Sequence, residues 1–306
     1  VAIMHVSNSF VAFPFAELPG HGVLDRLGLM AIRALGNGYG AVVAFFVISG
    51  FVLARSLDRK FDIGRFLKAR VFRLYPAAIL TVTIFTAVYY VFGFSLYKNA
   101  SFEPLNVLAN MLMLHVDIDA VMWSMKAEVA ATPLIILCVW LFQRHGPRPV
   151  VAIAVLLFGL SFVGQFNKAI GHDTNLAPVF AFPVGILVHF RGRQLADRMS
   201  PLAVSFAAIA SIAVFCACSF FKPSGTWTLL VQCLSAATLL MLIAWRPEAA
   251  IFRPLDLAIV RLYGRISYSF YLLHPLSLWH AGWLASHAIA QFPSVPVSLI
   301  VFLSFL

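Results

Sequence analysis

The chain has 306 residues, of which 61% are hydrophobic and only 11% are charged, and its mean hydropathy is +0.91. Soluble domains carry about 25% charged residues, so this composition excludes an ordinary soluble domain and indicates an integral membrane protein. The net charge of +10 does not require a nucleic-acid partner, because membrane proteins collect lysine and arginine in their cytoplasmic loops.

Apolar segments recur along the whole sequence, and a helix that crosses a bilayer needs about 20 mostly apolar residues. We expect ten transmembrane helices, at about residues 1–16, 36–57, 74–94, 122–142, 149–166, 175–190, 202–221, 227–245, 264–283 and 294–306. The first and last segments are short and the sequence begins with Val1, so we expect both helices to be truncated. We predict an all-α polytopic membrane protein that forms a single domain over residues 1–306.

Lysine and arginine are unevenly distributed between the loops that join these segments. Most of the 22 basic residues fall on one side, above all around the segment RFLKARVFRLYP, Arg65 to Pro76. The positive-inside rule assigns that side to the cytoplasm. The sequence therefore predicts that both termini are cytoplasmic.

The first span carries polar side chains on one face, formed by His5, Asn8 and Ser9. An imidazole has an unperturbed pKa near 6.5, and ionisable groups within a bilayer normally face the bundle interior. His5 is therefore a candidate for proton transfer. A membrane histidine can equally be a hydrogen-bonded strut, and the residues alone leave both interpretations open.

The segment RFLKARVFRLYP belongs to a run of seven cations between residues 55 and 73. Arg70 and Arg73 are three residues apart, so on a helix they share one face, where two guanidinium groups can grip a phosphate bidentately. Loop topology and contact with lipid headgroups explain the same cations. The sequence favours topology and leaves phosphate binding as the alternative.

The fourth span opens with a polar stripe in the segment WSMKAEVAAT. Ser124, Glu128 and Thr132 recur every four residues and so lie on one face. A charged side chain at the bilayer centre costs about 2.5–3.5 kcal/mol, which makes Glu128 a candidate functional residue. A structural strut is the alternative. We expect Lys126 to extend to the nearby interface, as long cationic side chains do.

The ninth span, RISYSFYLLHPL, places Ser267, Tyr271 and His274 on one face. Functional and structural roles for His274 both stay open.

Before the fourth span, His115, Asp117 and Asp119 suggest a cation site or, more simply, a solvated loop. The four cysteines lie in apolar spans without metal-ligand spacing, so we expect no metal site.

Five segments in this order carry a resemblance to a known family: VAIMH, GAVVAFFVISGFVLARS, RFLKARVFRLYPA, WSMKAEV and RISYSFYLLHPL. Together they resemble the acyltransferase-three family of integral-membrane O-acyltransferases, which includes O-antigen and exopolysaccharide acetyltransferases. The resemblance implies about ten helices. It also implies transfer of an acetyl or similar acyl group from cytoplasmic acyl-CoA to a hydroxyl group of a glycan or related acceptor.

The resemblance carries over to individual residues. His5 matches the catalytic histidine of the first helix, Arg70 and Arg73 match the paired arginines, and the block of Trp123, Ser124 and Glu128 matches a Trp-Ser-x-x-x-Glu motif. We expect catalysis by His5 and Glu128. We expect substrate or donor binding by Arg65, Arg70, Arg73, Ser49, Trp123, Ser124, Tyr271 and His274. Two features depart from the family: the arginine expected about ten residues before His5 is absent from this sequence, and Lys126 replaces a smaller residue.

The mechanism implied is general-base or covalent catalysis by His5, with Glu128 stabilising the imidazolium. We expect the arginines at the inner face and Glu128 about 9 Å below the outer end of its span. The expected donor is acyl-CoA, above all acetyl-CoA, which acts as a substrate and not as a permanently bound cofactor. The other expected partners are a glycan or small-molecule hydroxyl acceptor and membrane lipid. The expected location is a bacterial inner membrane. A proton-coupled secondary transporter or flippase is the alternative, because ten helices with buried His and Glu also suit a carrier.

Overall fold

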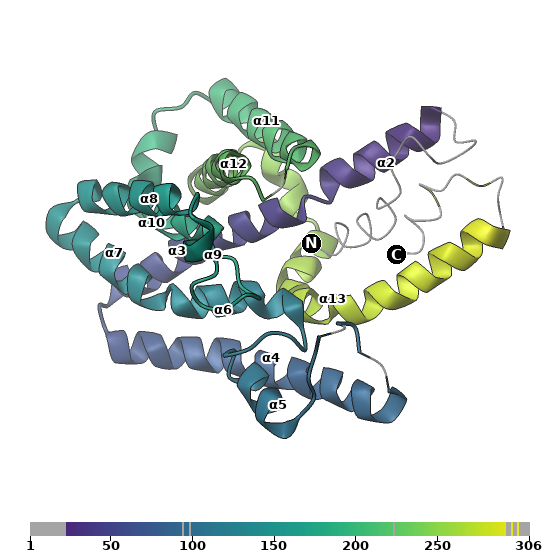
Figure 1. Cartoon of the computed structure of the whole chain (residues 1–306). Coiled ribbons are helices and arrows are strands. Elements are labelled where there is room, and N and C mark those ends of the chain that lie inside the picture. The colour runs from purple at the N-terminus through teal and green to yellow at the C-terminus, as the bar shows by residue number, and fades with distance from the viewer. Residues whose placement is uncertain are drawn as a thin grey trace.

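The computed structural model describes residues 23–291 except 94, 98 and 223, together with residues 295 and 299. Throughout these ranges the regular structure is helical and no strand is present (Figure 1). The predicted spans at 1–16 and 294–306, and with them His5, fall outside the described residues, except for residues 295 and 299.

The helices follow one another along the chain with short connections. They are α2 (Val23–Leu35), α3 (Gly38–Arg59), α4 (Ile63–Phe92), α5 (Pro104–Met111), α6 (Trp123–Ala130), α7 (Thr132–His145), α8 (Pro147–Leu160), α9 (Gly164–Asn167), α10 (Ala181–Ala196), α11 (Pro201–Ala217), α12 (Thr226–Trp245) and α13 (Ala258–Gln291). Short 3₁₀ turns are η1 (Ala120–Met122), η2 (Ala177–Phe180), η3 (Cys218–Phe220) and η4 (Ala250–Asp256).

Five helical stretches in the described part are long and apolar enough to cross a membrane. They are Arg26–Arg59, Ile63–Phe92, Ala120–His145, Pro201–Phe220 and Thr226–Trp245. These stretches confirm an all-α protein with membrane-spanning helices. The count of ten spans and the cytoplasmic location of the termini stay predictions.

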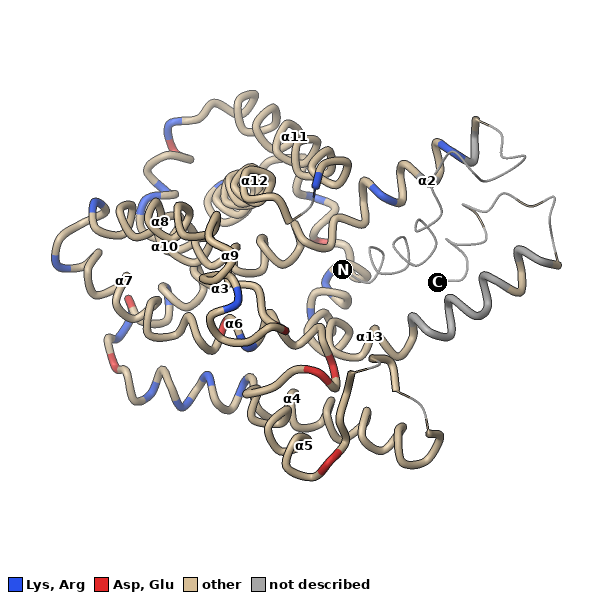
Figure 2. The backbone as a smooth tube through the Cα atoms, viewed as in Figure 1, with Lys and Arg blue, Asp and Glu red and all other residues tan. Residues whose placement is uncertain are grey.

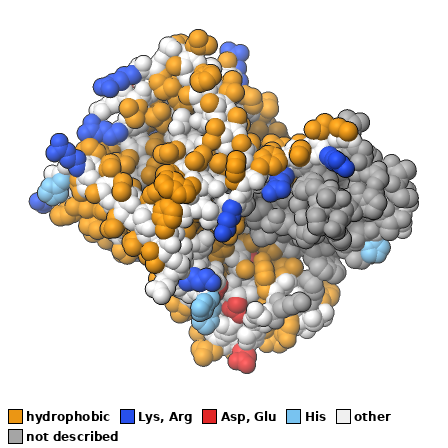
Figure 3. Space-filling view, turned by 45° about the horizontal axis from the view of Figure 1, so that its top comes forward, with side chains coloured by type: hydrophobic (Ala, Val, Ile, Leu, Met, Phe, Trp, Pro, Cys, Tyr) orange, Lys and Arg blue, Asp and Glu red, His pale blue; other side chains and the backbone are white. Residues whose placement is uncertain are grey.

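Large apolar side chains also remain exposed on the outside of these helices. Leu202 and Phe206 of α11 are 81% and 75% exposed, and Val155 and Leu156 of α8 are exposed as well. Figure 3 shows hydrophobic side chains spread over the visible face of the molecule. Exposed apolar surface of this extent marks a surface that contacts lipid or another apolar partner.

Helix α4 begins eleven residues earlier than the predicted third span, at Ile63 instead of residue 74. The Asp62 side chain caps it by accepting a hydrogen bond from the Arg65 backbone N–H at 3.0 Å. The basic segment is therefore the first part of a spanning helix and not a loop. Pro76 lies inside this helix, a position that membrane helices tolerate.

Two helices were not predicted from hydropathy, α2 and α5. With 13 and 8 residues, both are shorter than the roughly 20 residues of a span, so a search for long apolar segments passes over them. Pro104 occupies the first turn of α5, where a missing N–H is harmless. Helix α5 packs against α4 (Figure 1).

The main core forms where α3 crosses α10 and α12. A Cβ atom on Gly185 would lie 2.0 Å from the Val47 carbonyl oxygen, and one on Gly50 would lie 2.2 Å from the Phe182 carbonyl oxygen. Only glycine allows the two backbones to approach so closely, as in other small-residue contacts between membrane helices. Phe46 and Phe182 stack beside this crossing with ring centroids 4.5 Å apart.

A second core joins α4 to the segment between α5 and α6, to α6 and to α13. Its buried members include Leu74, Val82, Met122, Met125 and Leu272. Figure 1 shows α4 and α5 on one side of α6 and the larger group of helices around α3 and α10 on the other. The candidate site described next lies between these two cores.

Candidate active site

Arg70 and Glu128 form a buried ion pair between α4 and α6. The Arg70 Nη1 atom lies 3.4 Å from Glu128 Oε1, and Arg70 Nη2 donates a hydrogen bond to the Glu128 backbone carbonyl at 3.0 Å. The two residues are 7% and 4% exposed. Each charge compensates the other, which is the condition for burying either of them.

The ion pair leaves one carboxylate oxygen available. Glu128 Oε2 is buried and has no hydrogen-bond partner among the described residues. A buried carboxylate oxygen without a partner is rare in folded proteins. It can accept one more hydrogen bond, from a substrate or from another side chain.

This pairing corrects the predicted depth of Arg70. The sequence placed the arginines at the inner face and Glu128 nearer the outer end of its span. Because α4 already begins at Ile63, Arg70 lies seven residues into the helix, about 10 Å at 1.5 Å per residue. Arg70 therefore lies directly beside Glu128, and the two residues are not separated as the sequence had suggested.

A cavity of ≈ 330 Å³ adjoins the ion pair and receives side chains from α3, α4, α6 and α13. It brings together five residues that the sequence singled out for function: Ser49, Arg73, Ser124, Glu128 and Tyr271. These residues lie up to 222 positions apart in the chain (49 to 271). A concave site with a few converging polar groups in an apolar surround is typical of ligand binding.

Two hydroxyl groups form the polar wall of this cavity. Tyr271 donates a hydrogen bond to the Val121 carbonyl at 2.6 Å, and its oxygen lies 2.8 Å from Ser124 Oγ. Because Tyr271 gives its single proton to Val121, Ser124 is the donor in the second bond. The free lone pairs of Ser124 Oγ can then accept a hydrogen bond from a ligand.

Two predicted site residues support this wall without lining the cavity. Trp123 packs its ring against Phe46 and Tyr39, with centroids 6.3 and 6.4 Å away. His274 is 1% exposed, and its Nδ1 atom lies 2.5 Å from the Tyr271 carbonyl oxygen. His274 therefore contacts a lining residue, Trp123 packs against α3, and neither belongs to the cavity lining.

A second, basic pocket of ≈ 660 Å³ lies between the end of α3 and the beginning of α4. Its charged lining residues are Arg55, Arg59, Lys60, Asp62 and Arg65. In Figure 2, Lys and Arg recur along the first half of α4. Val52 lines both this basic pocket and the central cavity, so the two hollows adjoin each other.

Among the cations of the basic pocket, only Arg65 was named from the sequence as a binding residue. Arg55, Arg59 and Lys60 belonged to the run of seven cations for which topology was favoured and phosphate binding was the alternative. The density of cations between residues 55 and 73 was the available signal. Their convergence on one pocket depends on the sharp connection between α3 and α4, which the sequence pattern did not reveal.

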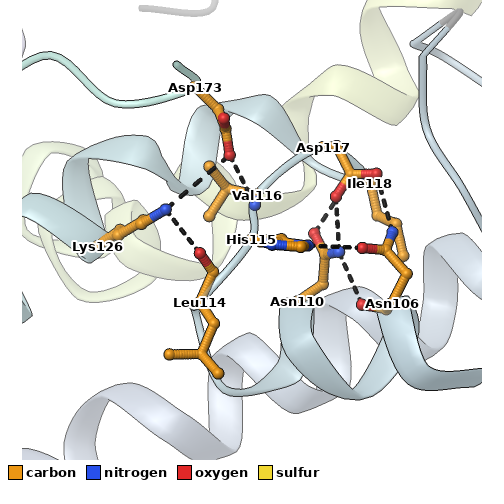
Figure 4. Close-up of polar contacts among 9 residues, drawn as sticks. All are labelled: Asn106, Asn110, Leu114, His115, Val116, Asp117, Ile118, Lys126 and Asp173. Atoms are coloured by element: carbon orange, nitrogen blue, oxygen red, sulfur yellow. Dashed lines mark hydrogen bonds and ion pairs between the residues drawn. The ribbon is translucent and has the colours of Figure 1, made fainter. Parts of the chain in front are cut away.

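The Lys126 side chain extends from α6 toward two segments that lie between the predicted spans, and its extension to the membrane interface stays a prediction. Its Nζ atom donates a hydrogen bond to the Leu114 carbonyl at 2.6 Å and lies 4.0 Å from the Asp173 carboxylate (Figure 4). Lys126 is 9% exposed. The loop before α6 folds back over this helix and supplies the carbonyl oxygen, so the ammonium group is satisfied inside the protein.

The same loop contains Asp117, which was considered for cation binding. Asp117 accepts hydrogen bonds from the Asn106 and Asn110 side chains at 2.9 and 2.8 Å (Figure 4). It also accepts one from the Ser101 N–H at 3.1 Å. Burial alone would raise the pKa of Asp117, but these hydrogen bonds lower it below its usual value. No three His, Cys, Asp or Glu side chains gather into a metal site in the part of the chain that the structure describes.

Asp119, two residues further on, is fully buried and does not belong to a solvated loop. One of its oxygens accepts the Val121 N–H at 3.4 Å, and the other has no partner among the described residues. Burial raises the pKa of Asp119 to about 8. Asp119 therefore caps the turn η1, which leads into Ser124 and the cavity.

Comparison with known proteins agrees with the segments that suggested an acyltransferase. A family model described as an acyltransferase domain matches residues 1–306. No curated protein and no solved structure matches the chain. Because the family model covers the whole length, the chain belongs to the acyltransferase-3 family.

Proposed function

We propose that this protein is a membrane O-acyltransferase that moves an acetyl or similar acyl group from cytoplasmic acyl-CoA to a hydroxyl group of a glycan or related acceptor. Membership of the acyltransferase-3 family supports acyl transfer. The observation that carries the proposal is the central cavity, where a Glu128 oxygen without a partner among the described residues lies beside Ser124, Tyr271 and Arg73. The family match favours this function over the secondary transporter considered as the alternative.

The basic pocket is the proposed site for the phosphates of the donor. Arg55, Arg59, Lys60 and Arg65 line it, and arginine forks suit phosphate oxygens well. The Arg70 guanidinium is occupied by Glu128, so Arg70 is not assigned to phosphate. The arm that bears the thioester would pass Val52, which both hollows share, and reach the central cavity.

The chemistry assigned to the cavity is attack of the acceptor hydroxyl on the thioester carbonyl. His5 takes the hydroxyl proton, the carbon–sulfur bond of the thioester breaks, and His5 returns the proton to the sulfur of coenzyme A. A transient acyl group on His5 is the covalent variant of the same reaction. The free oxygen of Glu128 can accept a hydrogen bond from the imidazole and stabilise its charged form.

The two arginines have different tasks in this proposal. Arg70 holds Glu128 ionised and oriented through its two contacts. Arg73 lines the cavity and is exposed, so its guanidinium group is available for the negative charge that develops on the thioester oxygen. Electrostatic stabilisation of that kind is often the largest single contribution to catalysis.

The test is acyl transfer by purified protein in lipid nanodiscs, measured as release of coenzyme A from acetyl-CoA with a panel of glycan acceptors. Glu128→Gln keeps the size of the side chain and removes its charge. We expect kcat to fall about 100-fold or more, as for loss of one preorganised electrostatic contact, with little change in the KM for acetyl-CoA.

Glu103→Gln is the matched control, because Glu103 is exposed and does not belong to the cavity lining. It should retain the wild-type rate. Turnover near the wild-type value in a folded Glu128→Gln protein would contradict the role assigned to Glu128. Wild-type protein that transports an acceptor across vesicles but releases no coenzyme A would overturn the proposed function.

A further inference from the structure

One wall of the central cavity is built almost entirely by a single apolar stripe of α3. Ala41, Phe45, Ile48 and Val52 line the cavity at positions i, i+4, i+7 and i+11, which fall on one face of a helix. Three further α3 residues line the cavity: Val42 and Leu53 are apolar, and Ser49 is polar. The four side chains of the stripe carry no hydrogen-bonding group.

The opposite wall of the cavity is mostly polar. Its lining residues come from α4, α6 and α13, and apart from Met125 all of them carry a polar group: Arg73, Ser124, Glu128, Ser267, Tyr268 and Tyr271. The cavity is therefore a slot with an apolar wall and a polar wall. The hydroxyl groups of an acceptor find partners at the polar wall, because a hydroxyl buried against the stripe of α3 would lose its hydrogen bonds with water.

The apolar stripe also has a direction. Val52, at its inner end, is the residue shared with the basic pocket. Ala41, at its outer end, lies eleven residues away, which corresponds to about 16 Å at 1.5 Å per residue. A group that enters past Val52 from the basic pocket therefore meets Ile48 and Phe45 before Ala41.

The volume of the cavity exceeds what an acetyl group needs. Three heavy atoms occupy about 90 Å³ if each takes roughly the 30 Å³ of a water molecule, whereas the cavity measures ≈ 330 Å³. The remaining space must accommodate both the reacting part of the acceptor and any longer acyl chain. The chemistry of the two walls divides that space between them.

We propose that the α3 stripe is the acyl-chain site of the enzyme and that residues 41 and 45 set the longest acyl group that is transferred. The proposal rests on the proposed function. The acyl chain lies along Ile48 and Phe45, with its end toward Ala41, while the acceptor hydroxyl binds at the wall that contains Ser124 and Tyr271. Acyl groups of more than two carbons are therefore substrates.

The test compares kcat/KM for acetyl-, butyryl- and hexanoyl-CoA in variants that act in opposite directions. Ala41→Phe fills the end of the stripe and should lower the hexanoyl-to-acetyl ratio at least tenfold. Phe45→Ala opens the stripe and should raise that ratio by a similar factor, because one methylene in an apolar pocket changes kcat/KM about 10-fold or more. Ala213→Phe, the same change as the first variant on an exposed position of α11, is the control and should keep the wild-type ratio.

Two results would overturn the proposal while leaving the proposed function intact. In one, both folded variants keep the wild-type ratio of hexanoyl to acetyl transfer. In the other, the variants change only the KM for the acceptor, which would make the α3 stripe part of the acceptor site. Failure of wild-type protein to release coenzyme A from any of the three donors would instead contradict the proposed function itself.

Discussion

Arg70 and Glu128 bind each other in a part of the protein that excludes water, so the two charges depend on one another. An isolated charge in that position would lose its hydration without compensation. The two contacts that Arg70 makes also hold the Glu128 backbone and one carboxylate oxygen in place. At the scale of single residues, the ion pair therefore links the stability of the fold to the orientation of the proposed catalytic carboxylate.

Arg70→Gln should lower the free energy of unfolding by about 3–5 kcal/mol, because it leaves the Glu128 carboxylate buried and unpaired. The double variant Arg70→Gln/Glu128→Gln should recover part of this loss, since it removes both charges. Thermal unfolding in detergent measures the effect. Arg73→Gln is the control with an exposed side chain and should change stability little. Equal losses for Arg70→Gln and Arg73→Gln would contradict the importance of the pair.

Asp119 gives a second prediction at this scale, through the dependence of stability on pH. Asp119 lies just outside the span that begins at Ala120, and its pKa of about 8 in the folded protein exceeds the value of about 3.9 for an unfolded chain. Between these two values the folded state holds a proton that the unfolded state has lost. The contribution of Asp119 to the free energy of unfolding therefore falls as the pH rises from about 4 to about 8.

Asp119→Asn removes that dependence. The stability of the variant relative to wild type should increase progressively between about pH 5 and about pH 8, as measured by thermal unfolding at several pH values. Asp117→Asn is the neighbouring control. It should be destabilising throughout this range, because Asp117 accepts three hydrogen bonds as a carboxylate. A pH-independent difference for Asp119→Asn would show that Asp119 is ionised in the folded protein.

Individual site residues were predictable to different degrees from the sequence. Glu128 was identified because an acidic residue inside an apolar span is costly. Its partnership with Arg70 was not, because the two residues are 58 positions apart and their contact depends on how α4 and α6 pack. The isolation of Asp119 from solvent was missed for a similar reason, since polar residues that alternate along a short segment between two spans normally indicate an exposed loop.

At the scale of helices, α3 organises the protein, because it contacts α10 and α12 on one side and lines the central cavity with another. The close crossing with α10 depends on Gly50 and Gly185. The long apolar helices were predictable from hydropathy and span length, whereas the short helices α2 and α5 were not. The exact start of α4 was not, because the charges of its first turns resemble a loop until the Asp62 cap and the pairing of Arg70 are known.

Gly185→Ala should destabilise the protein strongly, because the added methyl group would lie 2.0 Å from the Val47 carbonyl oxygen and force the two helices apart. The result to expect is a large loss of monodisperse protein in size-exclusion chromatography and a lower melting temperature. Gly159→Ala is the matched control: nothing lies within 4 Å of the place that its added methyl group would take, and alanine favours helix over glycine by about 1 kcal/mol. Unchanged behaviour of Gly185→Ala would contradict the close α3–α10 contact.

At the scale of the whole molecule, the basic pocket and the central cavity form a sequence of two sites that meet at Val52. The cations line the pocket between the end of α3 and the beginning of α4, and the proposed reactive groups lie in the cavity between α3, α4, α6 and α13. The sequence revealed that cations gather between residues 55 and 73 but not that they surround a pocket. The proposed division of labour is that the pocket binds the donor and the cavity carries out the transfer.

One kinetic measurement tests that division directly: kcat and the KM for acetyl-CoA, determined at low and high salt for wild type, Arg59→Gln and Glu128→Gln. Arg59→Gln should raise the KM about tenfold with kcat nearly unchanged, and should weaken the rise of KM with salt, because one exposed cation no longer attracts the phosphates. Glu128→Gln should lower kcat with the KM and its salt dependence preserved. The reverse pattern, with KM controlled by Glu128 and kcat by Arg59, would contradict the account.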